Sequence, residues 1–229
     1  MNQLLTTGII LRRTDYGEAD RIITILTPDH GKLHLLAKGV RRIKSKLAGG
    51  IELFSVSHLT YLAGRKELGT LVSTRLIKHY GHIVNDIDRT MLGYDLIKQL
   101  DKATEDEPEP EYFELLQAAF AALDDTAIDT ELVKVWFGAQ LLRQSGHTPN
   151  LQTDTAGAKL SADTRYDFSL DDMGFRPMPE GAYGADQIKF LRLVLGGNTP
   201  QTLAKITAVH DLTAATARLV ALMREQYIR

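Results

Sequence analysis

Residues 21–38 read RIITILTPDHGKLHLLAK, in which two runs rich in β-branched residues and leucine flank the turn-forming segment from Pro28 to Gly31. Runs of this length, bounded by Pro, Asp and Gly, are typical of two strands joined by a tight turn. Similar runs lie on both sides, and we predict strands over residues 7–13, 21–27, 32–38, 52–61 and 69–76. Five short strands, with a long connection after the third, favour a small closed barrel of the OB kind.

The periodicity changes after residue 80, where Ile83, Ile87, Met91 and Tyr94 recur at helical spacing. The sequence therefore predicts an α+β protein with two domains. An OB-fold, nucleic-acid-binding domain is expected over residues 1–80, and a helical domain over residues 81–229.

The helical domain is interrupted by a long insertion. A helix is expected to start at Asp129 or Thr130 and to end at Ser145-Gly146, because these residues are typical of helix termini. A loop-rich insertion at about residues 147–185 follows, with a small β element near Tyr166 to Leu170. Three further helices are predicted over residues 187–195, 199–206 and 211–228.

Composition narrows the class of protein. The chain has 229 residues, and its hydrophobic content of 44% is enough for packed cores. Residues 1–80 hold 13 Lys and Arg against 6 Asp and Glu, which leaves 14 against 23 in residues 81–229. A basic N-terminal part indicates contact with nucleic acid.

The absence of Cys excludes disulfides and thiolate metal sites. No apolar run is long enough to span a membrane, so we expect a soluble, cytoplasmic protein.

The strongest candidate site is a basic run from Lys38 to Lys46, in which five of nine residues are cationic. No Asp or Glu occurs between Asp29 and Glu52. The run lies in the long connection between the third and fourth strands, where cations stay solvated and can still reach a partner. Such residues can also serve solubility alone, but a cationic connection on a small barrel favours contact with the backbone of a nucleic acid.

Strand residues extend this candidate interface. The predicted DNA-binding residues are Arg12, Arg13, Arg21, Lys32, Lys38, Arg41, Arg42, Lys44 and Lys46. Strand alternation sends Arg12 and Arg13 to opposite faces, so one of them is expected to face elsewhere.

Aromatic support for base stacking is thin. Residues 1–80 offer Tyr16, Phe54, Tyr61 and Tyr80, and at least one of Phe54 and Tyr61 is expected in the core. Contacts to the charged backbone should therefore dominate, and binding should weaken as salt is added.

No catalytic constellation is found. Asp15, Glu18 and Asp20 resemble a Mg²⁺ site only superficially, and a solvated turn in which Asp20 pairs with Arg21 or Arg13 is favoured. His79 and His82 have a spacing that can share a metal, but no third ligand is in register. Phosphate-binding, dinucleotide-binding and nucleophile-elbow motifs are missing. We predict no enzyme and no metal or other cofactor.

An apolar stripe marks the helix predicted after Asp129. It comprises Val133, Trp136, Phe137, Leu141 and Leu142, flanked by Lys134 and Arg143. Helix core is the favoured interpretation, while a groove for a partner peptide is the alternative.

A series of motifs resembles the RecO family of bacterial DNA repair proteins. The motifs are Gly8–Arg13, Asp15–Ile22, His30–Leu33 and Ala37–Arg42, in this order. Further on, Gly146–Leu151 resembles the family's lead-in to a zinc-binding insertion.

The resemblance implies an OB fold followed by a helical domain, binding of single- and double-stranded DNA, and annealing of complementary strands. It also implies a non-enzymatic mediator that acts with RecR to load RecA onto strands coated by single-stranded DNA-binding protein (SSB) near the nucleoid, and it leaves open whether RecF takes part. By analogy Lys38, Arg41 and Arg42 contact phosphates. The acidic tail of SSB is expected to dock on the helical domain, with Lys134, Trp136, Phe137 and Arg143 as candidates.

The sequence departs from the family where many relatives carry four Cys. Asp154, Gly157 and residues 177–180 stand near those places, so we expect no zinc. The insertion is then expected to be mobile and to be held by packing of Phe168, Phe175 and Pro177. Two other functions stay open: an adaptor whose OB domain mainly contacts proteins, and, less favoured, an RNA-directed enzyme.

Overall fold

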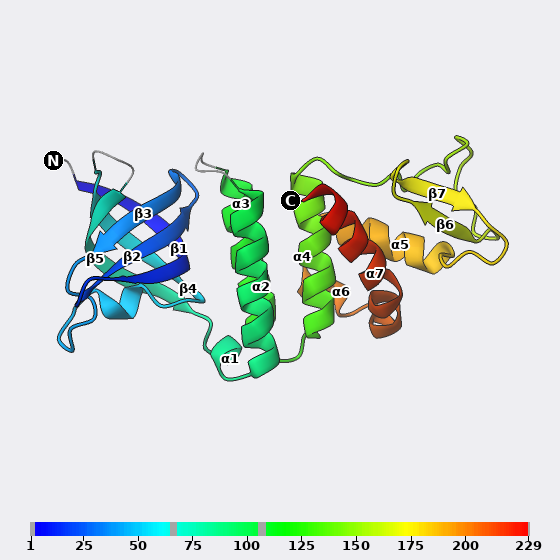
Figure 1. The fold of residues 1–229 in the computed structure, drawn as a ribbon. Helices are drawn as coiled ribbons and strands as arrows, with labels where there is room; N and C mark the ends of the chain where they lie inside the picture. The colour runs from blue at the N-terminus through cyan, green and yellow to red at the C-terminus, as the bar shows by residue number, and fades with distance from the viewer. Residues whose placement is uncertain (1–2, 65–67, 105–108, 229) are drawn as a thin grey trace. The chain divides into compact units, whose positions relative to one another are not determined.

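The computed structural model describes residues 3–64, 68–104 and 109–228 (Figure 1). The chain divides into two compact units, Met1–Asp125 and Thr126–Arg229. The barrel ends at residue 79, close to the predicted domain boundary, but the helices that follow it up to residue 124 belong to the barrel's own unit.

The first unit begins with a closed five-stranded barrel. Its strands are β1 (Gln3–Tyr16), β2 (Asp20–Thr27), β3 (Gly31–Ala37), β4 (Ser55–Leu62) and β5 (Leu68–His79). They follow the order β1-β2-β3-β5-β4, and β4 pairs back onto β1. All pairs are antiparallel except β3 with β5. The predicted α+β class with an N-terminal barrel is confirmed, and this architecture fits the OB fold.

The barrel core is apolar, and the residues that form it alternate with outward-facing residues along the strands. Ile10, Ile23, Ile25, Leu35 and Leu59 are among its buried members. Because every second side chain of a strand points inward, the outward residues between them stay free for other contacts.

The long segment between β3 and β4, residues 38–54, is called the basic link below. Val40 and Ile51 of this segment are buried in the barrel core. Phe54 ends it with a φ of 56°, in the left-handed region that side chains rarely adopt. This turn explains why β4 begins three residues later than predicted, at Ser55 rather than at residue 52.

Helices α1 (Gly81–Val84), α2 (Ile87–Ala103) and α3 (Pro110–Asp124) complete the first unit. The ring of Phe54 lies edge-on to Tyr94 and Phe120, at centroid distances of 5.3 and 5.5 Å. A Cβ at Gly93 would lie 2.6 Å from the Phe54 ring, so this glycine permits the close packing of α2 against the link.

The apolar residues that mark the start of the helical region in the sequence do not all lie on a buried face. Ile83 is buried, but the side chains of Ile87 and Met91 are 78% and 64% exposed. Helix α2 instead buries Leu96 and Leu100, on the side that carries Gly93. The apolar spacing was correct for a helix, but it did not reveal which side of the helix packs.

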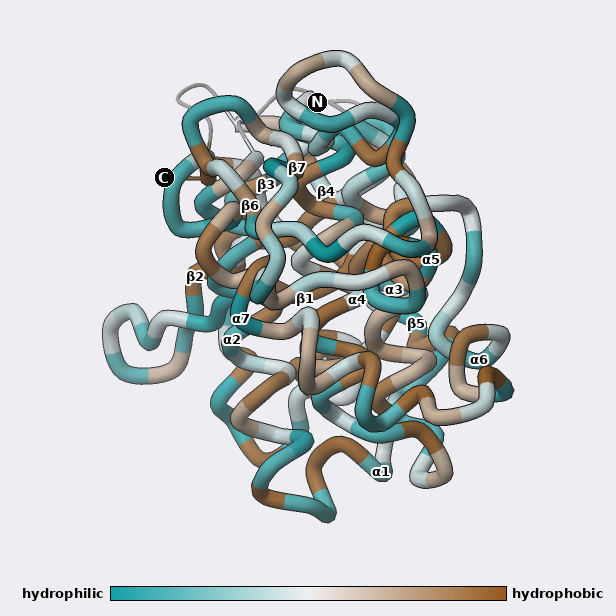
Figure 2. The backbone as a smooth tube through the Cα atoms, turned by 90° about the vertical axis from the view of Figure 1, so that its right-hand side faces the viewer, coloured by the Kyte–Doolittle hydropathy of each residue, from teal (hydrophilic) through white to brown (hydrophobic). Residues whose placement is uncertain are grey.

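The second unit is mainly helical. It contains α4 (Thr130–Gln144), β6 (Tyr166–Ser169), β7 (Gly174–Pro177), α5 (Ala185–Leu195), α6 (Pro200–Leu203) and α7 (Val209–Tyr227). Helix α4 packs against α5 and α7. Asp129 accepts a hydrogen bond from the Glu131 amide and caps α4, as predicted. Hydrophobic residues recur along the helices, and the connecting loops are more hydrophilic (Figure 2).

The insertion between α4 and α5 is a small aromatic-centred element. Phe175 is fully buried and packs edge-on against the rings of Tyr166, Phe168 and Tyr183. The predicted packing of Phe168 and Phe175 is confirmed, whereas Pro177 is exposed and takes no part. None of the helices in the described ranges is long and apolar enough to cross a membrane.

Candidate nucleic-acid interface

The basic link is held against the barrel by hydrogen bonds that its own backbone groups form. The Gly39 amide donates to the Asp20 carboxylate at 2.7 Å, and the Arg41 amide donates to the Ala19 carbonyl at 2.9 Å. Further along, the Leu47 carbonyl accepts from the Thr74 hydroxyl of β5 at 3.2 Å. These anchors fix the course of the link, while its cationic side chains lie on the outside.

Four of the nine predicted cations are already paired with acidic groups. Arg13 contacts Glu52 at 2.6 Å, Arg21 contacts Asp15 at 2.8 Å, and Arg41 lies 3.5 Å from the second Asp15 oxygen. Lys32 contacts both the backbone carbonyl and the carboxylate of Asp101, and its side chain is only 11% exposed. The prediction of Lys32 as a DNA contact is therefore not supported, because this ammonium group links β3 to the C-terminal end of α2.

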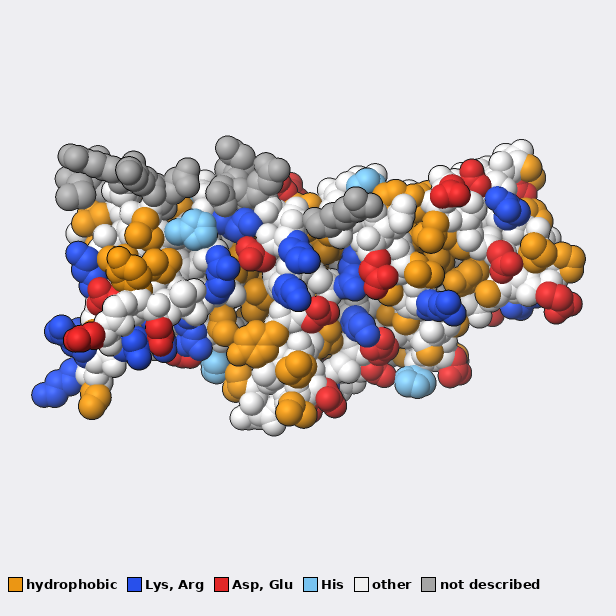
Figure 3. Space-filling model, viewed as in Figure 1, with side chains coloured by type: hydrophobic (Ala, Val, Ile, Leu, Met, Phe, Trp, Pro, Cys, Tyr) orange, Lys and Arg blue, Asp and Glu red, His pale blue; other side chains and the backbone are white. Residues whose placement is uncertain are grey.

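The remaining five predicted cations are exposed. They are Arg12, Lys38, Arg42, Lys44 and Lys46, and within the described part of the chain none of them forms an ion pair. Lys and Arg side chains gather where the link leaves the barrel (Figure 3, lower left). Unneutralised cations on an anchored segment provide a surface for a polyanion.

Arg12 and Arg13 differ as strand alternation predicts. Arg12 is exposed, whereas Arg13 is half-buried and points to Glu52 of the link. A register irregularity between Ile10 and Arg12 marks the place where β1 begins to extend toward the turn with β2.

Two cations of β5 were missed by the sequence reasoning. Arg75 and Lys78 are exposed, and β5 packs against the η1 turn (Ala48–Gly50) of the link. A signal was present, since no Asp or Glu occurs between Glu67 and Asp86. It was overlooked because Arg75 and Lys78 are separated and do not form a run.

The barrel offers little surface for base stacking. Phe54, Tyr61 and Tyr80 are all buried, and burial raises the pKa of Tyr61 and Tyr80. Tyr16 is 55% exposed. The expectation that at least one of Phe54 and Tyr61 lies in the core is confirmed, and in fact both do.

The acidic cluster of Asp15, Glu18 and Asp20 lies at the β1–β2 turn, as the sequence favoured, but its carboxylates have other partners than predicted. Tyr16 pairs with Asp20 across the β1–β2 hairpin. Asp15, rather than Asp20, pairs with Arg21, and its pKa is lowered, first by the hydrogen bond from Arg21 and then by the charge of Arg41. The predicted pairing of Asp20 with Arg21 or Arg13 is wrong, because its carboxylate accepts from the Gly39 amide.

The histidine pair has a structural explanation. The His82 amide donates to the Asp124 carboxylate at 2.8 Å, and the His82 ring lies 3.0 Å from the Asp124 carbonyl. His79 is exposed. Across the described residues no group of three or more His, Asp or Glu side chains is arranged to hold a metal ion.

The partner candidates of α4 divide into core and surface. Trp136 is 5% exposed and donates its ring N–H to the Asn198 carbonyl, and Phe137 is fully buried. Neither ring is accessible to a partner peptide, so the core interpretation of the stripe holds for both. Lys134 and Arg143 are exposed, and Lys134 contacts Glu131.

The insertion does not fit a four-thiolate zinc site. One Asp154 oxygen accepts from the amides of Ala156 and Ala158, both at 2.9 Å, and Gly157 has a φ of 86° and no side-chain donor. Residues 177–180 are exposed and include two prolines. The tight turn is closed by the Asp154 carboxylate, and a tetrahedral set of N or S ligands is missing from these positions.

A small β-barrel with an anchored, exposed cationic link is typical of proteins that contact nucleic-acid backbones. The family pattern described as Recombination protein O N terminal matches residues 1–80, and the pattern described as Recombination protein O C terminal matches residues 84–229. The chain belongs to the recombination protein O family.

Individual relatives agree with this assignment. The chain is 35% identical over 163 residues to a protein of Dehalococcoides mccartyi and 30% identical over 169 residues to one of Halalkalibacterium halodurans, and both are named DNA repair protein RecO. The matches cover 70% and 73% of this chain, and 64% and 65% of the two relatives. The matched stretch therefore spans slightly less than two thirds of the relatives' length.

Proposed function

We propose that the protein is a non-enzymatic mediator of DNA repair and recombination that binds the sugar–phosphate backbone of DNA through the basic link. The observation that carries this proposal is the set of exposed cations on the anchored link, Lys38, Arg42, Lys44 and Lys46, which form no ion pair with any described residue. Membership of the recombination protein O family supports it, as do relatives named for DNA repair.

The chemistry favours contact with the backbone rather than with the bases. Lys and Arg neutralise phosphates irrespective of sequence, and the burial of Phe54, Tyr61 and Tyr80 removes most of the barrel's stacking surface. A surface of this kind accepts single- and double-stranded DNA alike. By reducing the repulsion between two polyanionic strands, it also favours annealing of complementary sequences.

The basic link is tested by reversing the charge of two unpaired cations, with Arg42→Glu and Lys44→Glu combined. Binding of a fluorescein-labelled oligothymidylate, measured by anisotropy, should weaken at least about tenfold, because two phosphate contacts become repulsive. The matched control combines Lys98→Glu and Lys205→Glu, two exposed lysines outside the barrel. Equal losses in the two double variants would mean that net charge, and not the link, governs binding.

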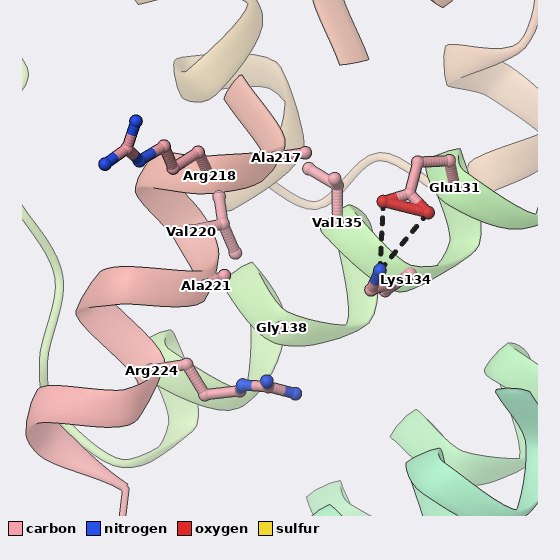
Figure 4. Close-up of a pocket in the computed structure, with 9 residues that line it drawn as sticks. All are labelled: Glu131, Lys134, Val135, Gly138, Ala217, Arg218, Val220, Ala221 and Arg224. Atoms are coloured by element: carbon pink, nitrogen blue, oxygen red, sulfur yellow. Dashed lines mark hydrogen bonds and ion pairs between the residues drawn. The ribbon is translucent and has the colours of Figure 1, made fainter. Parts of the chain in front are cut away.

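A groove in the second unit suits the proposed acidic tail of SSB. Helices α4 and α7 enclose about 250 Å³ above a floor that includes Val135 and Val220 (Figure 4). Arg224 extends along the groove, and Lys134, held by Glu131, lies at its other end. A short peptide with acidic and apolar residues matches both the floor and the cations. We propose this groove in place of the buried rings of Trp136 and Phe137.

Recruitment is tested by calorimetry with a peptide of the SSB tail. Arg224→Glu should abolish measurable binding, whereas Arg143→Glu, on an exposed arginine that does not line the groove, should leave it unchanged. Retained binding in Arg224→Glu would exclude the groove.

The adaptor alternative would be favoured if RecR and the tail peptide bound while DNA did not. Loading of RecA together with RecR, and any need for RecF, belong to the same proposal.

A further inference from the structure

Three charged side chains meet where the β1–β2 turn touches the basic link. Arg21 donates its Nε–H to one Asp15 oxygen at 2.8 Å, and Arg41 Nη2 lies 3.5 Å from the other oxygen. Arg41 also donates to the Gly17 carbonyl at 3.3 Å. Each oxygen of one carboxylate therefore faces a different guanidinium group.

The cluster is open to solvent. The side chains of Asp15, Arg21 and Arg41 are 52%, 30% and 37% exposed. A ligand can thus reach the guanidinium groups from outside without any movement of the barrel.

The two arginines are positioned by more than the carboxylate. Arg21 lies on β2, directly opposite Ala37 of β3. The backbone of Arg41 is fixed by its amide, which donates to the Ala19 carbonyl. Removing the charge of Asp15 should therefore leave both backbones in place, together with the Arg41 guanidinium that donates to the Gly17 carbonyl.

Carboxylates and phosphates bind guanidinium groups in the same way, with two oxygens facing N–H donors. We propose that Asp15 is a specificity-determining residue: its carboxylate occupies the anion site formed by Arg21 and Arg41, and a DNA phosphate binds there by taking its place. This inference rests on the proposed DNA-binding function.

The exchange discriminates between anions. An exposed ion pair is weak, so a phosphate of a chain already attracted by the unpaired Arg42 and Lys44 can replace the carboxylate. A small anion with one carboxylate lacks this additional attraction, and it therefore does not displace the Asp15 carboxylate. The residue thereby restricts the two arginines to ligands that carry many closely spaced negative charges.

The test compares two substitutions in the same turn that remove one negative charge each. Asp15→Asn frees the arginine pair, whereas Glu18→Gln is the matched control, because Glu18 is exposed and forms no ion pair among the described residues. Asp15→Asn should raise the affinity for the labelled oligothymidylate roughly three- to tenfold more than Glu18→Gln does, with a log–log salt slope steeper by about 0.7 per added phosphate contact. Thermal unfolding of both variants checks the fold, and Asp15→Ser replaces Asp15→Asn if that variant is unstable.

Two results would overturn the inference. Weaker binding by Asp15→Asn would show that the carboxylate positions the arginines for DNA, and an effect equal to that of Glu18→Gln would show that only net charge matters. In a background of Arg21→Gln and Arg41→Gln, the gain from Asp15→Asn should vanish.

The proposed function fails separately. If the wild-type protein did not bind the oligonucleotide at low salt, or if Arg42→Glu with Lys44→Glu left binding unchanged, the DNA-binding role of the link would be wrong, and the inference with it. Salt-sensitive wild-type binding with no specific effect at Asp15 would reject the inference alone.

Discussion

Two long irregular segments of the chain, the basic link and the insertion, are both held by hydrogen bonds to an Asp carboxylate. They differ in where their hydrophobic core comes from and in what they expose. In each segment backbone amides donate to an Asp carboxylate, which is Asp20 of β2 for the link and Asp154 of the insertion itself. The link places Val40 and Ile51 in a core that the barrel supplies, with Leu47, Ala48 and Leu53 packed against that core, and its cations stay outside. The insertion makes its own core around Phe175. A segment that packs against a core formed by other elements can keep its remaining residues exposed for a ligand.

The largest effect is expected where the segment builds its own core. Phe175→Ala should destabilise the second unit by about 3–5 kcal/mol, because the lost ring leaves a cavity among three aromatic neighbours. Urea unfolding followed through Trp136, the single tryptophan, measures the loss. Pro177→Ala, on an exposed neighbour in β7, should change stability by less than about 0.5 kcal/mol. Equal effects would contradict the aromatic core.

The link should respond in both stability and binding. Ile51→Ala should cost about 2–5 kcal/mol of barrel stability, since Ile51 is fully buried, and should weaken DNA binding by releasing one anchor of the link. Circular dichroism in urea and oligonucleotide anisotropy provide the two readouts. Ile43→Ala is the control, because the Ile43 side chain is fully exposed on the same segment. Destabilisation without any change in binding would mean that the cations do not depend on this anchor.

The two Asp carboxylates that accept backbone amides, Asp20 and Asp154, allow a direct comparison in which the expected losses of stability are smaller. Asp20→Ala and Asp154→Ala should each cost about 0.5–2 kcal/mol, as for the loss of a helix cap, because backbone amides lose their acceptor. Only Asp20→Ala should also alter DNA affinity, since its hydrogen-bond partner, the Gly39 amide, belongs to the basic link. Asp163→Ala, an exposed residue of the insertion, is the control for denaturation. A loss of DNA binding in Asp154→Ala would show that the insertion also contacts DNA.

Much of the fold followed from local pattern. The β-branched runs around Pro28–Gly31 predicted β2 and β3 to within about a residue, and Asp129 marked the start of α4. What failed depended on tertiary contacts. Ile87 and Met91 have helical spacing, but the close approach of Phe54 to Gly93 decides which side of α2 is buried.

The candidate site shows the same division. The cations from Lys38 to Lys46 were evident as a run. Which of them are neutralised was not, because Asp15 and Arg41 lie 26 positions apart and meet only through the barrel. The ion pair of Lys32 was not evident for a similar reason: its partner, Asp101, belongs to a helix that sequence alone does not place against β3.

The smallest effect concerns the pH dependence of stability that arises from Asp15, the carboxylate shared by Arg21 and Arg41. The pKa of Asp15 lies below its ordinary value of 3.8, chiefly because of the hydrogen bond from Arg21. A depressed folded-state pKa adds stability that is present above the unfolded value and is lost as the pH falls through the folded one. The contribution should be slight, since the group is exposed.

Titration of the Asp15 side-chain carboxyl by NMR measures this pKa. Arg21→Gln should return it toward 3.8 more fully than Arg41→Gln, because the hydrogen bond outweighs the charge of the more distant guanidinium. A larger change in Arg41→Gln would reverse that order, and it would mean that the link, rather than the β2 strand, holds the carboxylate. Bound oligonucleotide should also raise the pKa, because a phosphate that replaces Asp15 leaves its carboxylate without a cation and close to a negative charge.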